Sequence, residues 1–300
     1  MALHRTLLRH WNSAFSRGSG YEPTPPGVLM AEEDIRGYYI DFRAKTRSAF
    51  VSNPRAQLPT TIAQLALGWW ERHLSRDPVG RCEFERMCRL LREAAVQDGD
   101  CALWLHSFTD PKYGIEPPWI SALTQAQAAS VFVRAHLLDS HGEDAELAVA
   151  AIQPLLRRDG WSVVADTELG PALEEGPSSP PSLILNGWIY ALWGLRDVSV
   201  GLGHRDAGEM LSASSECLLQ TLPRYDVGWW TRYSLYPHLL PDLAKPFYHR
   251  LHVWQAEIMY RITGEESFRA AAARWLAYDQ PSRRARLIAQ KAAFVATGYR

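Results

Sequence analysis

Residues 135–156 read AHLLDSHGEDAELAVAAIQPLL, and this stretch decides the fold class that the sequence predicts. Two runs rich in Ala, Leu and Val flank a short polar segment at 140–143, whose composition is typical of a turn. In the first run and just before it, apolar residues return every three or four positions, which places them on one face of a helix. They are Ala122, Ala126, Ala129, Val133 and Leu137. The stretch therefore predicts two helices that pack against each other as a hairpin.

The same arrangement recurs along the chain at intervals of about 60 residues. The predicted polar turns fall near residues 75–77, 140–143, 203–206 and 263–265. Because each helical pair buries only one face, neighbouring pairs must stack on each other. Stacking that closes on itself gives an all-α fold, an α/α toroid or barrel of helical hairpins. An open helical solenoid is the competing arrangement.

The chain divides into three predicted segments. Residues 1–59 form an N-terminal arm, in which the β-prone run Tyr38–Phe42 favours a strand or hairpin. Residues 60–280 form the α/α barrel, and residues 281–300 form a basic C-terminal helix or tail with a solvated face. Long loops rich in Pro, Gly and aromatic residues connect the helical pairs, and a toroid would gather them at one mouth to make a cleft. They span residues 110–119, 159–182 and 225–245.

The composition excludes several classes of protein. The 32 Lys and Arg residues nearly balance the 33 Asp and Glu residues, so the chain shows no basic footprint for nucleic acid. No apolar run approaches the roughly 20 residues that span a bilayer, and the first residues do not resemble a signal peptide. The four cysteines lack paired zinc spacing, so we expect free thiols and a cytoplasmic protein. The 12 Trp residues suit sugar-ring faces, although core packing is their commoner use.

Several motifs, found in the right order, resemble the C-terminal domain of the D-glucuronyl C5-epimerases, which turn D-glucuronate into L-iduronate within heparan-type chains. The resembling stretches are Pro117–Leu138, Glu174–Asp197, Leu222–Leu235, Phe247–Gln255 and Ile262–Trp275. The resemblance implies a catalytic α/α barrel, a heparosan-like polysaccharide or oligosaccharide as substrate, and no cofactor. No phosphate-binding glycine motif is present either. A homodimer stays open.

Epimerisation at C5 of a uronate sets chemical requirements of its own. One group must remove the C5 proton from one face of the ring, and another must protonate the opposite face. Cationic or amide donors must also hold the negative charge that develops on the carboxylate. By the resemblance, Glu175 and Tyr248 form the acid/base pair, with Tyr233 as a third catalytic residue. Which of Glu175 and Tyr248 is the base stays open.

The candidates for substrate binding have polar or aromatic side chains in or near these motifs. They are Trp119, Gln125, Gln127, Glu174, Asn186, Arg232, His249 and His252. Helical spacing places His249 and His252 on one face, but two ligands without a third acid do not predict a metal site. For Gln125 and Gln127, buried amides that satisfy helix ends are an equal alternative.

One position departs from the family pattern. Family members have Tyr directly after the catalytic Glu, in the motif E-E-Y-P, whereas this chain has Gly176. Either Glu175 and Tyr248 suffice, or another phenol such as Tyr113 or Tyr236 replaces the missing one, or epimerase activity is lost. Two alternative functions follow. One is a uronate polysaccharide lyase, which shares the first proton abstraction, and the other is a non-catalytic glycan-binding homologue.

Overall fold

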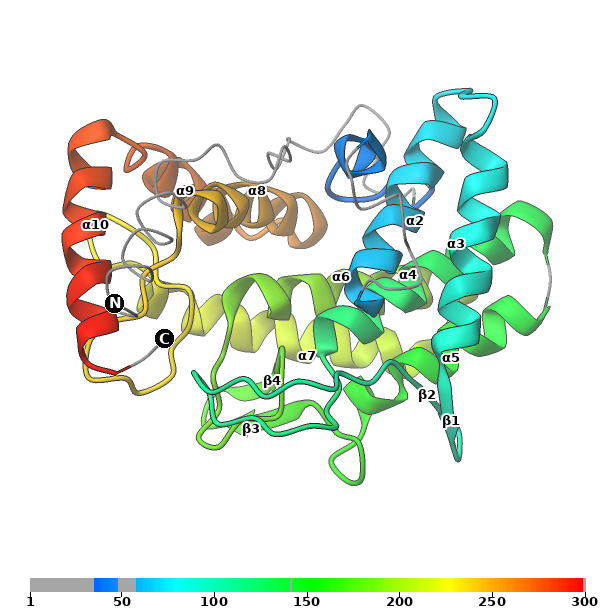
Figure 1. Cartoon of the computed structure of the whole chain (residues 1–300), viewed down its shortest axis with the longest axis horizontal. Helices are drawn as coiled ribbons and strands as arrows, with labels where there is room; N and C mark the ends of the chain where they lie inside the picture. The colour runs from blue at the N-terminus through cyan, green and yellow to red at the C-terminus, as the bar shows by residue number, and fades with distance from the viewer. Residues whose placement is uncertain (1–34, 48–57, 141, 299–300) are drawn as a thin grey trace, which may run out of the picture.

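A computed structural model describes residues 35–47, 58–140 and 142–298 of the chain. Helices dominate this part of the molecule, which confirms the all-α prediction (Figure 1). The helices are η1 (Arg43–Arg47), α2 (Pro59–Leu74), α3 (Gly80–Ala94), α4 (Ala122–Asp139), α5 (Gly142–Leu156), α6 (Leu185–Leu202), α7 (Arg205–Thr221), η4 (Leu222–Tyr225), α8 (Pro246–Thr263), α9 (Glu266–Leu276) and α10 (Pro281–Ala296). The short strands are β1 (Val96–Asp98), β2 (Cys101–Leu103), β3 (Val164–Thr167) and β4 (Gly170–Leu173).

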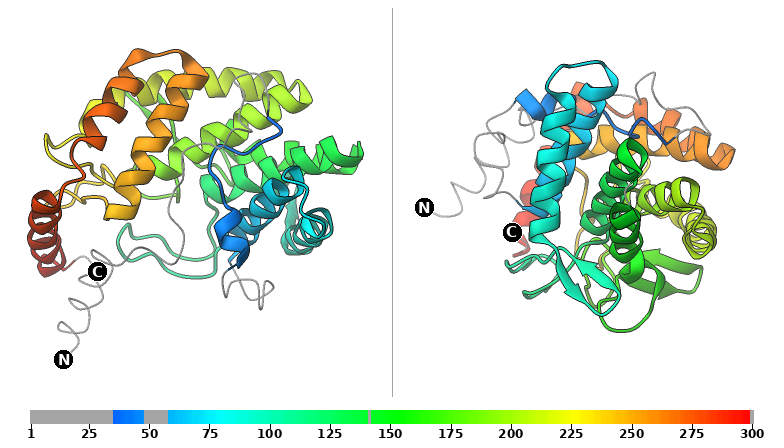
Figure 2. Two further views of the ribbon diagram at one scale, coloured as in Figure 1. Left: turned by 90° about the horizontal axis from the view of Figure 1, so that it is seen from above. Right: turned by 90° about the vertical axis from the view of Figure 1, so that its right-hand side faces the viewer.

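The long helices pack in pairs that follow the chain: α2 with α3, α4 with α5, α6 with α7, and α8 with α9. The turn inside each pair falls where the sequence predicts it. The first members α2, α4, α6 and α8 also pack on one another in that order, so they form an inner row. Seen from above, the pairs follow one another along an arc, with α10 at its end (Figure 2). Closure of this arc into a ring stays a prediction.

Local sequence explains where the inner helices begin and end. The hydroxyl of Ser121 accepts the backbone N–H of Thr124 and so caps α4, which ends at Ser140 in the left-handed conformation. Helix α8 begins at Pro246, because proline is tolerated in the first turn, where its missing N–H would have no helical partner. It ends before Gly264, whose φ of +76° suits glycine best.

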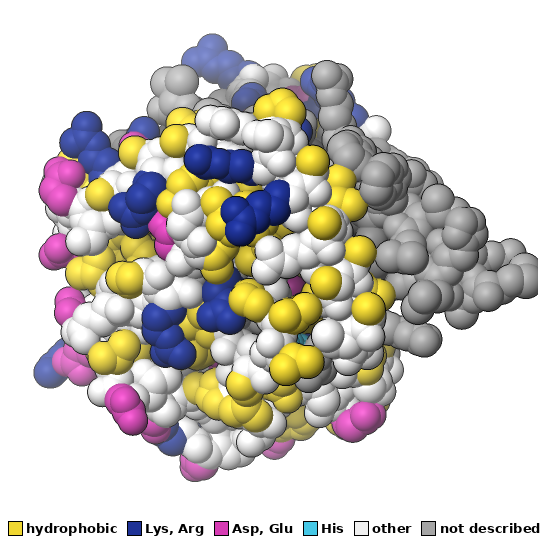
Figure 3. All heavy atoms as spheres, turned by 90° about the vertical axis from the view of Figure 1, so that its left-hand side faces the viewer, with side chains coloured by type: hydrophobic (Ala, Val, Ile, Leu, Met, Phe, Trp, Pro, Cys, Tyr) yellow, Lys and Arg dark blue, Asp and Glu magenta, His cyan; other side chains and the backbone are white. Residues whose placement is uncertain are grey.

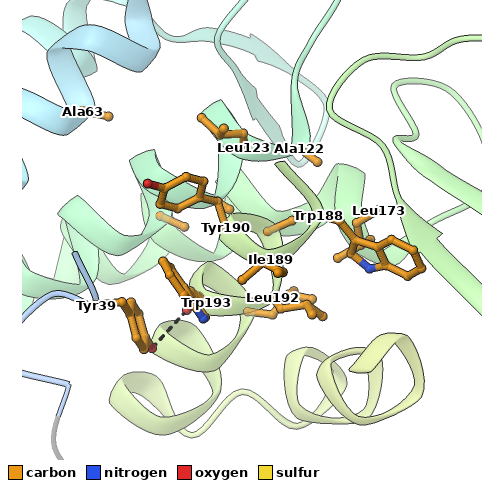
Figure 4. Packing of buried hydrophobic residues seen from close by; sticks show 14 of the residues in the cluster. Tyr39, Ala63, Ala122, Leu123, Leu173, Trp188, Ile189, Tyr190, Leu192 and Trp193 are labelled. Atoms are coloured by element: carbon orange, nitrogen blue, oxygen red, sulfur yellow. Dashed lines mark hydrogen bonds between the residues drawn. The ribbon is translucent and has the colours of Figure 1, made fainter. Parts of the chain in front are cut away.

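The core lies around α4 and α6, which are buried on nearly all sides. Figure 4 shows Trp188, Ile189 and Trp193 of α6 packed among aliphatic side chains. The indole N–H of Trp188 donates to the hydroxyl of Ser214 at 2.8 Å, and the indole N–H of Trp104 donates to a backbone oxygen of α3 at 2.9 Å. Both Trp residues are therefore core aromatics with partnered N–H groups.

The β-prone run Tyr38–Phe42 forms no strand, so this part of the N-terminal arm prediction is wrong. The run bends across the core and leads into η1. Its aromatic side chains are buried by packing on α6 rather than by strand pairing. Tyr39 stacks on Trp193 with ring centroids 4.7 Å apart, and its hydroxyl donates to Oδ1 of Asp197 at 2.9 Å. Residues 1–34 and 48–57 of the predicted arm lie outside the described residues.

Two small antiparallel hairpins were not expected from the sequence. In the first, Val96 of β1 pairs with Leu103 of β2, and in the second, Val164 of β3 pairs with Leu173 of β4. Strands of three or four residues carry too short a pattern to stand out in the sequence. The β3–β4 hairpin bears on function, because the Glu174–Glu175 pair follows directly after β4.

Helix α10 is more than a solvated tail. Leu287 and Phe294 are buried, so one face of the helix is docked on the rest of the molecule. The basic residues of α10 lie elsewhere along it, and the helix contains no acidic residue. Within the described ranges, none of the helices has the length and apolar character that a membrane span requires.

Candidate active site

Two neighbouring cavities share one wall. The larger, of about 420 Å³, is lined by η1 and by residues from the first turns of α2, α4, α6 and α8. The smaller, of about 240 Å³, lies between two loops and α10. Glu175 and Tyr248 line both cavities, so they stand where the two meet. Because four inner helices direct their amino ends toward the larger cavity, their dipoles favour an anionic ligand there.

The position of Glu175 depends on its neighbour Glu174. The carboxylate of Glu174 is buried and accepts the backbone N–H groups of Ser182 and Leu183, both at 2.7 Å. These bonds fasten the chain just after β4, so that the next side chain reaches the cavities. Gly187 in α6 leaves the room, since a β-carbon at that position would stand 2.5 Å from Oε2 of Glu175. Glu174 is thus a positioning residue in this structure and lines neither cavity.

The surroundings of Glu175 favour a protonated carboxyl. Burial raises the pKa of Glu175 to about 7, and the negative charges of Asp110 and Glu174 add to the rise. Lys112 and a hydrogen bond from the Asn186 amide, at 3.4 Å, oppose it. Since a pKa near 7 lies close to neutral pH, Glu175 is able both to accept and to release a proton there.

Two phenols adjoin this carboxyl. Tyr248 lies in the first turn of α8, and its ring meets the ring of Tyr233 edge-on with centroids 4.8 Å apart. Burial raises the pKa of Tyr248 to about 12, and the charge of Glu175 adds to the rise. Burial also raises the pKa of Tyr233 well above its usual value. Both phenols are therefore neutral at physiological pH and suited to donate a proton.

The larger cavity combines aromatic faces with neutral polar groups. Trp119 stacks on His106 with ring centroids 4.3 Å apart, and Phe108 meets Trp119 edge-on at 5.2 Å. Burial lowers the pKa of His106 to about 4, so its imidazole is neutral at physiological pH. Asn186 and Gln64 add amide groups to the lining. Aromatic faces beside amide and hydroxyl groups suit the binding of a sugar ring.

The smaller cavity is rich in lysine. Lys112 comes from the loop after β2, Lys245 directly precedes α8, and Lys291 belongs to α10. Asp242 is buried beside them and pairs with the ammonium of Lys112 at 2.5 Å. It also accepts the hydroxyl of Tyr113 at 3.1 Å. Ammonium groups at this place can hold the negative charge that a carboxylate-bearing substrate carries or develops.

The structure brings together five of the predicted site residues and leaves the others apart. Glu175, Tyr248, Tyr233, Asn186 and Trp119 line one or both cavities. The predicted residues outside the lining of both cavities are Gln125, Gln127, Glu174, Arg232, His249 and His252.

Among the residues left apart, Gln125 is a buried amide, but it bonds the backbone in and after β2 and not a helix end. Its side chain accepts the backbone N–H of Trp104 at 2.9 Å and donates to the backbone oxygen of Ala102 at 2.8 Å. Gln127 accepts the amide of Gln64, at 3.1 Å, and is fully buried behind it. Gln127 therefore supports a lining residue of the larger cavity from behind.

The two histidines are buried away from the cavities. The ring of His249 lies on Trp230 with centroids 3.9 Å apart, and the hydroxyl of Thr231 bonds Nδ1 of His249 at 2.8 Å and Nδ1 of His252 at 3.1 Å. Arg232, the next residue, is half-buried in an extended segment that bridges to Leu243. In the described part of the chain, no three His, Cys, Asp or Glu side chains lie close enough together to hold a metal ion.

Residues 97–277 match the family described as the D-glucuronyl C5-epimerase C-terminus, which covers more than half of the chain. The chain belongs to this family. A D-glucuronyl C5-epimerase of Caenorhabditis elegans is 30% identical over 191 aligned positions, and the alignment covers 57% of this chain and 30% of the nematode protein. An uncharacterized protein of Methanocaldococcus jannaschii is 25% identical over 180 aligned positions, and the alignment covers 58% of this chain and 56% of the archaeal protein.

The C5-epimerase family membership supports an epimerase-like function for this chain. The similarity is confined to a part of each protein, and the chain spans well under two thirds of the length of both relatives. Helix α10 and the N-terminal elements η1, α2 and α3 lie outside the matched residues 97–277. Both cavities nevertheless include residues from these outer elements.

The family pattern predicts Tyr where this C5-epimerase family member has Gly176, and the structure shows what fills the space. A β-carbon on Gly176 would stand 2.7 Å from Cδ1 of Ile115 and 3.2 Å from Cζ3 of Trp119. Those two side chains occupy the room that a larger residue would need. The phenol of Tyr113 lines the smaller cavity, where it contacts the ring of Tyr236 edge-on with centroids 5.5 Å apart.

Reasoning from the sequence missed the lysines of this family member. The chain has only four lysines among its 32 Lys and Arg residues, and all four line the two cavities. Lys45 lies in the larger cavity, and Lys112, Lys245 and Lys291 lie in the smaller one. The residues are far apart in the sequence, so no motif joins them. The scarcity of lysine beside so many arginines was the available signal.

Proposed function

We propose that the protein is a uronate C5-epimerase that converts D-glucuronate to L-iduronate residues in a heparosan-like polysaccharide or oligosaccharide. The observation that carries this proposal is the shared wall, where Glu175 and Tyr248 face the same two cavities. One is an acid with a pKa near 7, and the other is a neutral phenol. Epimerisation needs such a pair, because the proton leaves one face of the ring and another arrives on the opposite face.

The pKa values favour Glu175 as the base when the ionised form is present. Its carboxylate takes the C5 proton, and the electron pair of the C5–H bond moves into the uronate carboxylate as an enolate-like charge. The O–H of Tyr248 then delivers a proton to C5 from the opposite face. The cycle leaves Glu175 protonated and Tyr248 as a phenolate, and proton exchange with solvent restores both. Lys112, near the ring of Tyr233, supplies positive charge while the intermediate exists.

The two cavities together fit a chain substrate better than a single sugar. A uronate between Glu175 and Tyr248 would have one neighbouring sugar in the aromatic larger cavity and the other in the lysine-rich smaller cavity. We therefore propose a glucuronate-containing polysaccharide as the partner.

Proton NMR in D₂O tests this function directly. An unsulfated oligosaccharide of glucuronate and N-acetylglucosamine is incubated with the protein, and the C5–H signal is followed. The expected result is loss of that signal with new iduronate resonances, and absence of both changes in Glu175→Gln and Tyr248→Phe. Because Tyr248→Phe removes one oxygen and leaves the ring, a loss of exchange in this variant reports on the hydroxyl and not on packing.

Other outcomes identify the alternatives. An absorbing unsaturated uronate would show a lyase, since the C5 proton leaves but the 4-linked sugar is expelled. Saturable binding of the oligosaccharide without any exchange would show a glycan-binding homologue, which the filled space at Gly176 favours. Either result contradicts the epimerase proposal.

A further inference from the structure

The placement of lysine in this molecule is selective. Arginine supplies nearly all of the basic surface, and each of the few lysines lines a cavity beside Glu175. A lysine ammonium is a compact, strongly hydrated charge, and its enclosure is costly unless an anion accompanies it. Each enclosed ammonium is therefore expected to have an anion beside it.

Of the three lysines in the smaller cavity, Lys112 alone has a carboxylate partner among the described residues. Lys112 pairs with Asp242, which also accepts the hydroxyls of Tyr113 and Ser234 at 3.1 and 3.2 Å. Among the residues that the structure describes, no carboxylate lies within ion-pair distance of Lys245 or Lys291. Asp242 is therefore occupied, and two enclosed ammonium groups are left beside it.

The pKa values of Lys245 and Lys291 are both lowered, as expected for enclosed ammonium groups that repel one another. Burial lowers the pKa of Lys291 to about 8, and repulsion from Lys112 and Lys245 lowers it further against the attraction of Asp242. Burial also lowers the pKa of Lys245, and Lys112 contributes in the same direction. An anion placed between them would reverse both effects.

The charged side chains of the helix that carries Lys291 are all basic. The helix holds Arg283, Arg284, Arg286 and Lys291 without an acidic residue, and Phe294 docks it beside Lys112, whose ammonium lies 5.8 Å from the ring centroid. Figure 3 shows the face of the molecule on this side, where Lys and Arg side chains gather near the centre and acidic ones lie mainly toward the edge.

From these observations we propose that Lys245 and Lys291 form an anion-binding subsite in the smaller cavity, which holds a carboxylate or sulfate group of the bound glycan. The inference rests on the proposed glycan substrate and deepens it. It assigns a binding role to α10, which lies outside the family match. Lys45 is not part of this subsite, because it lies in the larger cavity and bonds the side chain of Gln64.

The small number of lysines makes a direct test practical. Reductive methylation with ¹³C-formaldehyde keeps the charge and labels four side chains besides the terminal amine, and Lys→Arg variants assign each signal. The pKa of each labelled lysine is measured without added ligand, and then with sodium glucuronate, with sodium sulfate and with methyl glucoside. We expect the pKa values of Lys245 and Lys291 to rise by about one unit with glucuronate or sulfate and to stay unchanged with methyl glucoside. The anion that causes the larger rise in pKa identifies the group that the subsite holds.

Either of two results would overturn the proposal: unchanged pKa values for both lysines at saturating anion, or an equal response to methyl glucoside. The readout is independent of catalysis. If C5-proton exchange occurs but the lysine pKa values do not respond, the subsite is rejected and the epimerase proposal stands. If the lysine pKa values respond but no exchange occurs, the subsite stands and the epimerase proposal is rejected.

A second measurement uses matched variants of one helix. Lys291→Gln and Arg286→Gln each remove one positive charge from α10, but Arg286 is exposed and lies over Trp229. Calorimetry with the unsulfated oligosaccharide should show about tenfold weaker binding for Lys291→Gln. Arg286→Gln should bind as the unchanged protein does, and Lys291→Arg should retain most of the affinity. Equal losses in Lys291→Gln and Arg286→Gln would show a general charge effect and contradict the subsite.

Discussion

The carboxylate of Glu175 lies directly against Gly187 in α6: a β-carbon on Gly187 would stand 2.5 Å from Oε2 and 2.7 Å from Cβ of Glu175. Glycine is the residue that leaves this space open. Gly187 therefore helps to determine where the acid group points, although it has no functional group of its own.

Gly187→Ala is expected to lower the rate of C5-proton exchange about 100-fold, because the added methyl group displaces the Glu175 carboxylate by about an ångström. Circular dichroism should show a folded protein, since alanine is a better helix former than glycine. Gly142→Ala is the control, because Gly142 begins α5 and has open space around its Cα. Unchanged exchange in Gly187→Ala would mean that the position of Glu175 does not matter for the reaction.

The exchange rate should rise as the pH increases through about 7 and then level off, because Glu175 acts as a base only when it is ionised. The negative charge of Asp110 contributes to the raised pKa of Glu175, so Asp110→Asn should shift this rise to lower pH. Asp206→Asn, an exposed change in α7, should leave the profile unchanged. A rise that stays in place in Asp110→Asn would assign the profile to another group.

Ionised Glu175 should also lower the free energy of unfolding at high pH. Its pKa in the folded protein is raised above the value of an unfolded chain, so the stability it contributes is present at about pH 4 and is lost as the pH rises to about 7. Glu175→Gln should therefore stabilise the protein at pH 8 by about 1–3 kcal/mol and have little effect at pH 4. Urea unfolding at both pH values measures the difference. An equal effect at both would contradict the raised pKa.

Gly176→Tyr should not restore a family-like site in this chain. The side chains of Ile115 and Trp119 fill the space, so the new phenol would overpack the core by an amount worth about 1–3 kcal/mol. Thermal unfolding should show the loss, and the double variant with Ile115→Ala should recover part of it. If Gly176→Tyr alone is as stable as the unchanged protein, the side chains of Ile115 and Trp119 must move aside more readily than their packing indicates.

The helical architecture was readable from the sequence because its signals are local and repeated. Each polar turn between apolar runs marks a hairpin, and the structure places turns such as Ser140 and Gly203 at those points. The run Tyr38–Phe42 misled the prediction because aromatic residues favour strands on average. Here tertiary packing on Trp193 overrides that preference, and only the folded molecule shows the partner.

The candidate site was predictable only where a motif carried it. Glu175, Tyr233 and Tyr248 fall in recognisable stretches and converge in the structure. His249 and His252 share such a stretch, yet their rings turn into the core, because position in a motif does not fix which way a side chain points. Lys291 lies outside every motif and reaches the cavity only through the docking of α10.

The buried contacts of Tyr39 and Arg134 join the segment before η1 to the core. Arg134 pairs with Asp197 at 2.6 Å and donates to the backbone oxygen of Gly37 at 2.8 Å, while Tyr39 stacks on Trp193. A fragment limited to residues 97–277 would keep the ion pair, but Arg134 would lose the Gly37 acceptor and Trp193 would lose its stacking partner. The core thus extends beyond the residues that match the family. Fragments for expression or for grafting onto other proteins keep these contacts only if they begin before Gly37.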